Sequence, residues 1–322
     1  MSELTIVMYH YVRDLERSRY PKIKARRTFE FERQLDHLER HHSIVTAQDV
    51  ISAVSGEKPL PDKAAWLTFD DGYLDHYTTV FPLLYRRGWQ GSFFSPARTV
   101  LEGRLLDVNK IHLILASVND VRGVIERIKE HVDANLEKLP LSFTEFLETH
   151  AIATRFDPAE VVFIKKMLQH VLPPYLRASV IDDLFCKFVS ADERAIAAEL
   201  YMSLEQMKLM LSCGMFFGSH SYDHLWMNRL TPKEQEREVD LSMNFLAELG
   251  VPMRDWVMCY PYGAYDASLI EILKRRKCAI GLTTQVAVAD ISRDMPLQLP
   301  RLDTNDLPIC RSADLTNKAE KL

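Results

Sequence analysis

Two adjacent aspartates, Asp70 and Asp71, follow the apolar run LTF and come directly before Gly72. Two like charges this close raise the free energy of the folded state unless a cation neutralises one of them or the two take different roles. Gly72 permits a sharp turn, so both side chains could reach one crevice. The position suits a metal ion, although an aspartate at a strand end also commonly caps the following helix.

Two histidines, His220 and His224, stand four residues apart in FGSHSYDHLWM, directly after an expected strand. This spacing lets both imidazoles face one cation, either from a helical turn or from a tight loop. Two histidines and one carboxylate form a common divalent-metal site that leaves positions open for water and substrate. The spacing alone also arises by chance, so its combination with the aspartate pair is what indicates a site.

The segment MCYPYGAYD, at 258–266, also follows an expected strand. Pro261 and Gly263 would hold the backbone in a fixed turn and aim the Tyr262 N–H outward. An N–H aimed in this way could stabilise an oxyanion, although Pro-Tyr-Gly also makes ordinary turns.

Strands and helices alternate at both ends of the sequence, which predicts a parallel sheet, either open or closed into a barrel. The helix expected at 232–249 has the clearest limits, because Thr231 and Glu234 form a capping box and Gly250 follows its end. The expected strands are 4–10, 64–70, 90–95, 215–220, 256–261, 279–284 and 297–302, and the other expected helices are 28–42, 47–55, 73–87 and 266–277.

The middle of the chain has a different composition. From Arg104 to Cys213 there is one glycine, Gly123, and the segment is rich in helix-forming residues at three- and four-residue spacing. We therefore expect an insertion of four to six helices, either a stabilising subdomain or a lid or dimer surface. The predicted division is 1–103 for the first part of the catalytic barrel, 104–213 for the helical insertion, 214–303 for the second part of the barrel and 304–322 for a C-terminal tail.

The composition of the 322-residue chain is that of an ordinary globular protein. A net charge of −5 gives no general reason to expect nucleic-acid binding. The first twenty residues do not resemble a secretory signal and no apolar run is long enough to span a membrane, so we expect a cytoplasmic protein with no transmembrane segment. The five cysteines are odd in number and have no CxxC spacing, which predicts reduced thiols.

The three motifs occur in the order TFDDG, HSxxH and xxYPYG, each at the end of an expected strand. In this order they resemble the motifs of the NodB-homology polysaccharide deacetylases, carbohydrate esterase family four. The resemblance covers about 1–103 and 214–303. It implies a distorted (β/α) barrel with one divalent metal ion, most commonly zinc, and a hydrolase that removes N-acetyl groups from amino sugars. It also implies that Asp70 is the catalytic base, that Tyr262 lends its backbone N–H to the oxyanion, and that the metal ligands are Asp71, His220 and His224.

This division of roles gives the two carboxylates different functions. The metal neutralises Asp71, and Asp70 takes a proton from a water whose pKa the metal can lower to about 7. A general acid must then protonate the departing amine.

Two members of the family pattern are absent from their usual places. Cys259 stands where the family commonly has an arginine that orients the base, and His224 is the last histidine of the chain. Arg301, in LPRLD, could replace the missing cation, although a structural salt bridge is the alternative. His10, in MYHYV, could be the acid, could line the substrate pocket or could be structural, and Asp70 could also return its proton.

Two further features concern the substrate. Aromatic side chains near the motifs could stack on sugar rings or could pack in the core: Tyr9, Tyr11, Tyr73, Tyr222, Trp226 and Tyr265. A basic loop could bind the phosphate of a nucleotide- or lipid-linked sugar or could be a solvated surface: Arg13, Arg17, Arg19, Lys22, Lys24, Arg26 and Arg27.

The sequence therefore predicts a metal-dependent hydrolase of linear amide bonds that removes an acetyl, or possible formyl, group from an N-acylated amino sugar, such as a precursor of a glycan or lipopolysaccharide. The alternative is a carbohydrate-binding or scaffold protein of the same fold with impaired catalysis. An aspartyl-phosphate phosphatase is disfavoured, because its two aspartates flank one residue and here they are adjacent. No oligomeric state is predicted.

Overall fold

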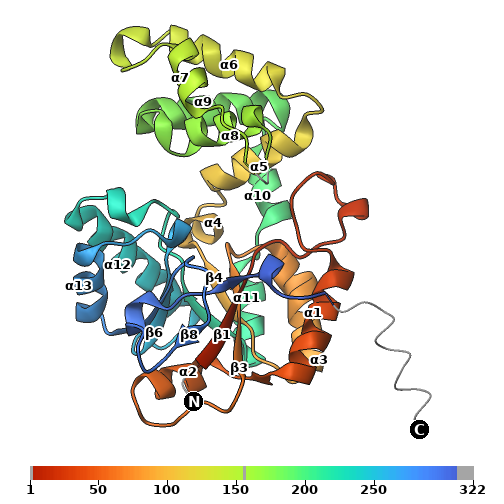
Figure 1. Ribbon diagram of the computed structural model, residues 1–322, viewed down its shortest axis with the longest axis vertical. Coiled ribbons are helices and arrows are strands. Elements are labelled where there is room, and N and C mark those ends of the chain that lie inside the picture. The colour runs from red at the N-terminus through yellow and green to blue at the C-terminus, as the bar shows by residue number, and fades with distance from the viewer. Residues whose placement is uncertain (1–2, 155–156, 310–322) are drawn as a thin grey trace. The chain divides into compact units, whose positions relative to one another are not determined.

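A computed structural model gives the structure of residues 3–154 and 157–309 (Figure 1). Contacts between residues divide the chain into two compact units, each with its own buried core. The first unit contains the described residues of Met1–Asp14, Ala25–Gly103 and Ala198–Leu322, and the second contains those of Leu15–Lys24 and Arg104–Ala197.

The first unit is built on one nine-stranded sheet in the order β7-β6-β5-β4-β3-β1-β8, with β2 beside β3 and β9 beside β1. Every pairing is parallel except β1 with β8. The parallel order follows from the alternation of strands and covering helices along the chain. The strands are β1 (Glu3–Tyr9), β2 (Ser43–Ile44), β3 (Ala64–Asp70), β4 (Ser92–Ser95), β5 (Phe216–Ser219), β6 (Trp256–Cys259), β7 (Cys278–Leu282), β8 (Ala289–Asp290) and β9 (Leu302–Asp303).

The segment before β9 closes the sheet. Leu299 forms a parallel bridge with Leu282 at the end of β7, and β9 pairs with β1, so that Leu302 lies opposite Val7. The strand predicted at 297–302 is therefore wrong for most of its length, because Pro296–Gln298 form a 3-10 turn (η7) instead. One short segment thus joins the two sides of an irregular barrel, and the predicted distorted (β/α) barrel is confirmed.

Helices cover the outside of this barrel. The cores on the two faces of the sheet follow the alternation of the strands: Leu67 and Phe69 pack with the outer helices, whereas Trp66 packs with Phe94 and Ile280 in a second cluster. The covering helices include α1 (Thr28–His41), α2 (Ala47–Val54), α3 (Phe81–Arg86), α4 (Ala97–Leu101), α11 (Leu204–Ser212), α12 (Pro232–Leu249) and α13 (Ala267–Arg275).

The predicted capping box of α12 is confirmed, with Thr231 accepting from the Glu234 N–H and Gly250 at the C-cap. The helix predicted at 73–87 begins at Leu74, close to the expected start. Part of it is a π-helix (η2, His76–Val80), which continues into α3.

The second unit is helical. Val124, Ile128 and Val132 form a buried stripe at four-residue spacing on α6, which packs against α9. Between Arg104 and Cys213 the described residues contain seven helices, more than the four to six predicted: α5 (Asp107–Ser117), α6 (Arg122–Asp133), α7 (Phe143–His150), α8 (Ala159–Lys166), α9 (Pro174–Phe188), α10 (Glu193–Leu200) and α11.

The limits of the helical unit differ from the predicted 104–213. Residues 198–213 belong to the first unit, because α11 packs against α12 and η2. Residues 15–24 belong to the second unit, because Lys22 donates to the Val118 carbonyl (2.9 Å) and Lys24 pairs with Asp157 (2.7 Å). Much of the predicted tail at 304–322 lies outside the described residues.

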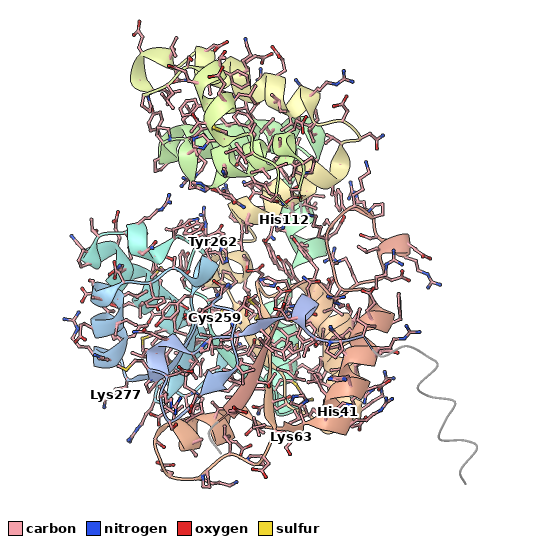
Figure 2. All side chains as sticks on the ribbon, in the orientation of Figure 1. His41, Lys63, His112, Cys259, Tyr262 and Lys277 are labelled. Carbon is pink, nitrogen blue, oxygen red and sulfur yellow. The ribbon has the colours of Figure 1, made fainter. Side chains whose placement is uncertain are left out.

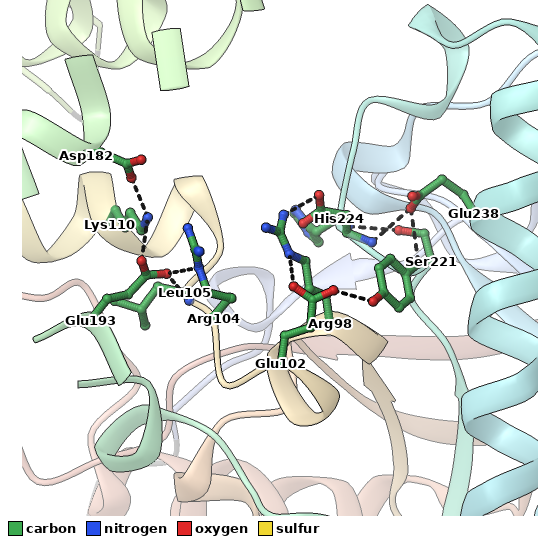
Figure 3. Close-up of polar contacts among 12 residues, drawn as sticks. Arg98, Glu102, Arg104, Leu105, Lys110, Asp182, Glu193, Ser221, His224 and Glu238 are labelled. Atoms are coloured by element: carbon green, nitrogen blue, oxygen red, sulfur yellow. Dashed lines mark hydrogen bonds and ion pairs between the residues drawn. The ribbon is translucent and has the colours of Figure 1, made fainter. Parts of the chain in front are cut away.

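The chain enters and leaves the helical unit at points joined by one carboxylate (Figure 3). Glu193 accepts from Arg104 and from the Leu105 N–H, both at 2.9 Å, and lies 3.2 Å from the buried Lys110 ammonium. Lys110 also contacts Asp182 on α9. These contacts explain how the main helical segment of this unit keeps its two ends, near Arg104 and Glu193, together.

Among the described residues no helix combines the length and apolar character needed to cross a membrane. Cys186, Cys213, Cys259 and Cys278 are free thiols, as predicted, and Cys310 lies outside the described residues.

The turn after β3 explains how adjacent aspartates share one side of the sheet. Strand alternation places Thr68 and Asp70 on the inner face, and Asp71 would normally point outward. Instead Asp71 has a left-handed backbone (φ 73°), and so has Gly72 (φ 69°). Gly72 also lies against the neighbouring strand, where a Cβ atom would be 2.1 Å from Ser95 Oγ.

We expect Gly72→Ala to lower the free energy of unfolding by about 2–4 kcal/mol, because it combines a left-handed backbone with a steric clash. Gly88→Ala is the matched control. Gly88 has a similar φ of 67°, but a Cβ atom there meets nothing within 4 Å, so the expected cost is only about 1 kcal/mol. Urea unfolding of both variants measures the difference, and equal costs would show that the contact with Ser95 does not matter.

Candidate metal centre and active site

The structure brings the seven predicted site residues together at the carboxyl ends of the parallel strands. Such strand ends are where parallel α/β folds commonly build their sites. The residues are His10 after β1, Asp70 and Asp71 at the end of β3, His220 and His224 after β5, Tyr262 in the turn after β6 and Arg301 just before β9.

Three of these side chains form a compact set of potential metal ligands. The Nε2 atoms of His220 and His224 each lie 3.4 Å from Asp71 Oδ1. The potential ligand atoms of the three residues lie within 4.8 Å of one another, and all three side chains are buried. Two donors on a tetrahedral zinc ion at about 2.1 Å are separated by about 3.4 Å, so the spacing fits one cation.

Neighbouring groups orient these side chains. His220 Nδ1 donates to the Cys259 carbonyl (2.8 Å), which orients the ring so that Nε2 faces Asp71. The Tyr73 hydroxyl donates to Asp71 Oδ2 (2.6 Å), so Oδ1 is the oxygen that faces the histidines. Fixing the second nitrogen of an imidazole and the second oxygen of a carboxylate is typical of metal ligands in proteins.

The protonation states of Asp71 and His224 also fit a cation. Burial alone would raise the pKa of Asp71, but the imidazoles beside it hold that pKa well below its ordinary value. Burial lowers the pKa of His224 to about 3, although the Asp71 charge opposes this, so its imidazole is neutral. Burial alone would lower the pKa of His220, but the neighbouring Cys259 and the hydrogen bond with Asp71 hold it well above its ordinary value, so a bound cation would replace a proton on this imidazole. Within the described part of the chain, Asp71 Oδ1 and His224 Nδ1 are buried without a hydrogen-bond partner. A bound cation would satisfy the orphaned carboxylate oxygen.

A second group of potential ligands overlaps the first and consists of Asp70, His220 and Cys259. Arg301 occupies both oxygens of Asp70. Burial raises the pKa of the Cys259 thiol, although the Arg301 charge opposes this, so the thiol stays protonated. A protonated thiol and a carboxylate that is already paired make this group the poorer cation site.

The second carboxylate, Asp70, forms a buried pair with Arg301. The guanidinium donates to Oδ1 at 3.0 Å and to Oδ2 at 2.8 Å. Burial alone would raise the pKa of Asp70, but the Arg301 charge outweighs it and holds the pKa below its ordinary value. The carboxylate is thereby ionised and fixed in orientation, which is the geometry expected of a bidentate arginine pair.

Arg301 itself is fixed from three sides. Its Nε donates to the Thr283 carbonyl (2.9 Å), and Nη1 also donates to Thr68 Oγ1 (3.1 Å). Thr68 in turn donates to the Val7 carbonyl (2.8 Å). Arg301, in the segment that closes the barrel, therefore places its guanidinium beside Asp70 and near the small Cys259 side chain.

His10 lies on the outer side of the pair. Its Nε2 is 4.0 Å from Asp70 Oδ2, and 41% of its side chain is exposed to solvent. The backbone carbonyl of His10 accepts from His76 Nε2 (2.9 Å), and burial lowers the pKa of His76 to about 4. A neutral His76 thus anchors His10, whose imidazole reaches both Asp70 and the solvent.

Left-handed backbone conformations gather at the site. Of seven non-glycine residues with positive φ among those described, four are site residues or their neighbours: Asp71 (73°), Ser221 (59°), His224 (53°) and Tyr262 (57°). Such conformations cost roughly 1–3 kcal/mol each and persist only where the surroundings impose them. The hydrogen bonds around the loops must therefore supply that constraint.

Figure 3 shows the bonds that hold the loop between the two histidines. Ser221 Oγ accepts from the His224 N–H (3.0 Å). Glu238, buried on α12, accepts from the backbone N–H groups of Tyr222 (3.1 Å) and Asp223 (2.9 Å). Arg98 on α4 pairs with the Asp223 carboxylate. The loop is thus fixed to two helices, and both histidines with it.

The aromatic residues near the motifs are mostly core residues. Tyr9, Tyr11 and Tyr73 are buried, with Tyr11 stacked on Tyr73 at 3.9 Å between ring centroids. Tyr222, Trp226 and Tyr265 are only partly buried.

The basic loop carries cations that are largely paired within their own units. Besides Lys22 and Lys24, Arg13 pairs with Asp75 at 2.7 Å and Arg26 with Glu30 at 3.3 Å. Such pairs favour the structural interpretation of the loop over phosphate binding.

Several supporting residues could not be found from the sequence. Glu238 lies in PKEQEREVD, where nothing distinguishes it from the other charged residues of a surface helix. Thr68 and His76 flank the aspartates in LTFDDGYLDH, and only this closeness could have suggested them.

We expect Glu238→Ala to lower the free energy of unfolding by about 1–3 kcal/mol, because two buried N–H groups lose their acceptor. Glu238→Gln keeps an oxygen at the same place and should cost clearly less. Glu248→Ala, an exposed position on the same helix, is the control. Urea unfolding gives the three values, and equal stability of the Ala variant and the wild type would contradict the role of Glu238 in the loop.

Solved structures share this fold. The chain superposes on the deacetylase PplD of Streptococcus pyogenes with a TM-score of 0.58 and 18% identity, over 98% of this chain and 97% of that one. It superposes on IcaB of Ammonifex degensii with a TM-score of 0.54 and 20% identity, over 99% and 97%. At identities this low, the structural similarity establishes the fold alone.

Sequence relatives match shorter segments. A Bacillus subtilis strain 168 protein named as a polysaccharide deacetylase, YxkH, is 30% identical over 101 residues, which is 31% of this chain and 35% of that protein. The poly-beta-1,6-N-acetyl-D-glucosamine N-deacetylase of Escherichia coli K12 is 47% identical over 51 residues, 16% of this chain and 8% of that protein. The matched segments therefore span about a third or less of these relatives.

A model of the polysaccharide deacetylase family matches residues 57–279, more than half of the chain, and includes both the TFDDG and the HSxxH motifs. Together with the barrel and the grouping of the motifs at its strand ends, this match shows that the chain belongs to the polysaccharide deacetylase family.

Proposed function

We propose that this protein is a metal-dependent deacetylase that hydrolyses the N-acyl group of an amino sugar, with Asp70 as the catalytic base. One observation carries the proposal. The two adjacent carboxylates have different partners, a guanidinium for Asp70 and two imidazoles for Asp71. A binding protein has no use for an ionised carboxylate held beside a cation site with open positions.

Asp71, His220 and His224 would hold the divalent metal ion, and the donor set of two imidazoles and one carboxylate suits zinc. When bound, such an ion supplies Lewis-acid activation of water and of the amide carbonyl.

Asp70 has the position and charge of a general base. Arg301 keeps it ionised and orients it, so it can accept a proton from the attacking water. His10 is a candidate for the general acid, because its imidazole is near Asp70 and accessible to solvent. Proton donation to the departing nitrogen as the C–N bond breaks gives a free amine and a carboxylate. Asp70 could also return its own proton at that step.

Tyr262 would stabilise the oxyanion through its backbone N–H. The turn after β6 is held by bonds from the Gly263 N–H to the Tyr260 carbonyl (2.8 Å) and from the Ala264 N–H to the Pro261 carbonyl (3.0 Å). Neither bond uses the Tyr262 N–H. Its ring lies against His224, with centroids 4.6 Å apart, so the turn is next to the proposed metal.

The substrate we propose is an N-acylated amino sugar. A soluble, nucleotide-linked or lipid-linked precursor fits the predicted cytoplasmic location. The E. coli relative is named for poly-beta-1,6-N-acetyl-D-glucosamine, which supports an N-acetylglucosamine-type unit. Formyl and acetyl groups undergo the same chemistry at the carbonyl, and a methyl-sized pocket separates them.

Catalytic impairment is the alternative, and it is supported by the missing arginine before the Pro-Tyr turn and by the absence of a histidine after His224. Arg301 now fills the place beside Asp70 that this residue would occupy. The geometry therefore favours the hydrolase.

We expect Asp71→Ala and His220→Ala to weaken metal binding by more than about 100-fold, because each removes a ligand. Cys259→Ser should keep one equivalent of metal, because the thiol belongs to the poorer set. Metal content after dialysis, measured by mass spectrometry, decides between them. Full metal content in both ligand variants would refute the assignment of the site.

We expect the wild-type protein to release acetate or formate from at least one member of a panel of N-acylated amino sugars, free, nucleotide-linked and polymeric. Asp70→Asn should lower turnover about 100- to 10,000-fold and Arg301→Ala about 100-fold, because the base is lost or misplaced, while metal is retained. Arg275→Ala, which breaks an exposed pair with Glu236, is the matched control. Undiminished turnover of Asp70→Asn would rule out Asp70 as the base.

A further inference from the structure

A column of flat side chains extends outward from the proposed metal ligands. The Tyr262 ring meets the His224 ring edge-on, with centroids 4.6 Å apart and an angle of 67°. Trp226 stacks on Tyr262 with centroids 4.3 Å apart and the planes within 5° of parallel. The Arg229 guanidinium covers Trp226 at 5.2 Å. His224, Trp226 and Arg229 come from one loop, and Tyr262 comes from another.

Tyr262 occupies a conformation that its side chain disfavours. Its φ of 57° and ψ of 10° are left-handed, which costs about 1–2 kcal/mol for a residue other than glycine. Gly263, which follows, is also left-handed (φ 67°) and lies against Thr284, where a Cβ atom would be 2.2 Å from Oγ1. The Tyr262 carbonyl accepts a long bond from Thr284 Oγ1 (3.4 Å). The ring stack is a side-chain contact that constrains the orientation of this residue in addition to the backbone bonds of the turn.

We propose that Trp226 is a positioning residue that, by stacking on the Tyr262 ring, holds the Tyr262 backbone in its left-handed conformation and so aims the N–H toward the oxyanion. The role of that N–H rests on the proposed function. A parallel aromatic pair contributes about 0.5–1.5 kcal/mol beyond the area it buries, which is comparable with the cost of the left-handed conformation. The two energies are close, so loss of the stack should release the turn.

The main alternative role for Trp226 is a platform for a sugar ring. Stacking on a sugar requires an open face of the indole. Tyr262 stacks on the Trp226 indole, and the Arg229 guanidinium also lies over this ring, so two side chains of the protein already occupy it. A structural contact therefore fits the arrangement better than a sugar platform does.

The test compares Trp226→Leu, which loses the flat ring, with Trp226→Phe, which keeps one. In the metal-free protein, hydrogen exchange in the peptide 258–266 should become about tenfold faster in the Leu variant, a loss of about 1.4 kcal/mol of protection, and stay near wild type in the Phe variant. The Gly263 and Ala264 amides, which are hydrogen-bonded, report on the turn. In the metal-loaded enzyme, kcat should fall about tenfold in the Leu variant with KM nearly unchanged, because an oxyanion donor acts mainly in the transition state.

Trp89→Leu is the matched control, because Trp89 also carries an arginine over its ring (Arg87, 5.4 Å) and packs against the core outside the column. It should change neither exchange in 258–266 nor kcat. Arg229→Gln gives a second, milder variant that keeps the indole and should keep the turn.

Unchanged exchange in Trp226→Leu would overturn the proposal whether or not the protein is a deacetylase. A raised KM with unchanged kcat would also overturn it, because Trp226 would then contact substrate. Faster exchange in a wild-type background that hydrolyses no N-acyl sugar would support the positioning of Tyr262 and refute the proposed function instead.

Discussion

Two ionised carboxylates on consecutive residues, both buried, are the constraint on which the site depends. Asp70 and Asp71 would repel each other strongly in a protein interior unless each had its own counter-charge or ligand. The fold gives Asp70 a bidentate guanidinium and turns Asp71 toward two imidazoles. This separation leaves Asp70 available for the proposed role of base while Asp71 is suited to a cation, and it determines where Arg301 and the two histidines must lie.

Left-handed backbone at Asp71, Ser221, His224 and Tyr262 shows where conformational energy is stored. Each of these residues departs from the regular path of a strand end so that its side chain or N–H faces the same small volume. The support comes from rigid elements outside the site: Glu238 from α12, Arg98 from α4 and Ser95 from β4 as the close neighbour of Gly72. A site assembled from loops is thereby given the precision of the helices and strands beneath it.

The same short chain segment closes the barrel and completes the site. Leu299 joins the end of β7, Leu302 joins β1, and Arg301 between them reaches Asp70. The arginine that the family pattern places before the Pro-Tyr turn is absent, and Cys259 there provides only a small side chain. A cation from a different strand end satisfies the same electrostatic need, because a carboxylate is oriented by the charge and geometry of its partner and not by where that partner lies in the sequence.

The sequence by itself determined the order of strands and helices, the capping of α12, the parallel barrel, and the set of residues that meet at the site, because hydrophobic periodicity and capping are local properties. Local signals were weaker where the structure is irregular. The predicted strand at 297–302 is a 3-10 turn at its start and a strand only at Leu302, the helical segment has more helices than expected, and its limits differ from those predicted. Only the tertiary structure decided that Arg301 pairs with Asp70, that His76 anchors His10, that Glu238 holds the histidine loop, and that Trp226 covers Tyr262. Those contacts join residues up to 231 positions apart, and no local pattern records them, since the free energy that selects them comes from burial and charge pairing in the folded chain.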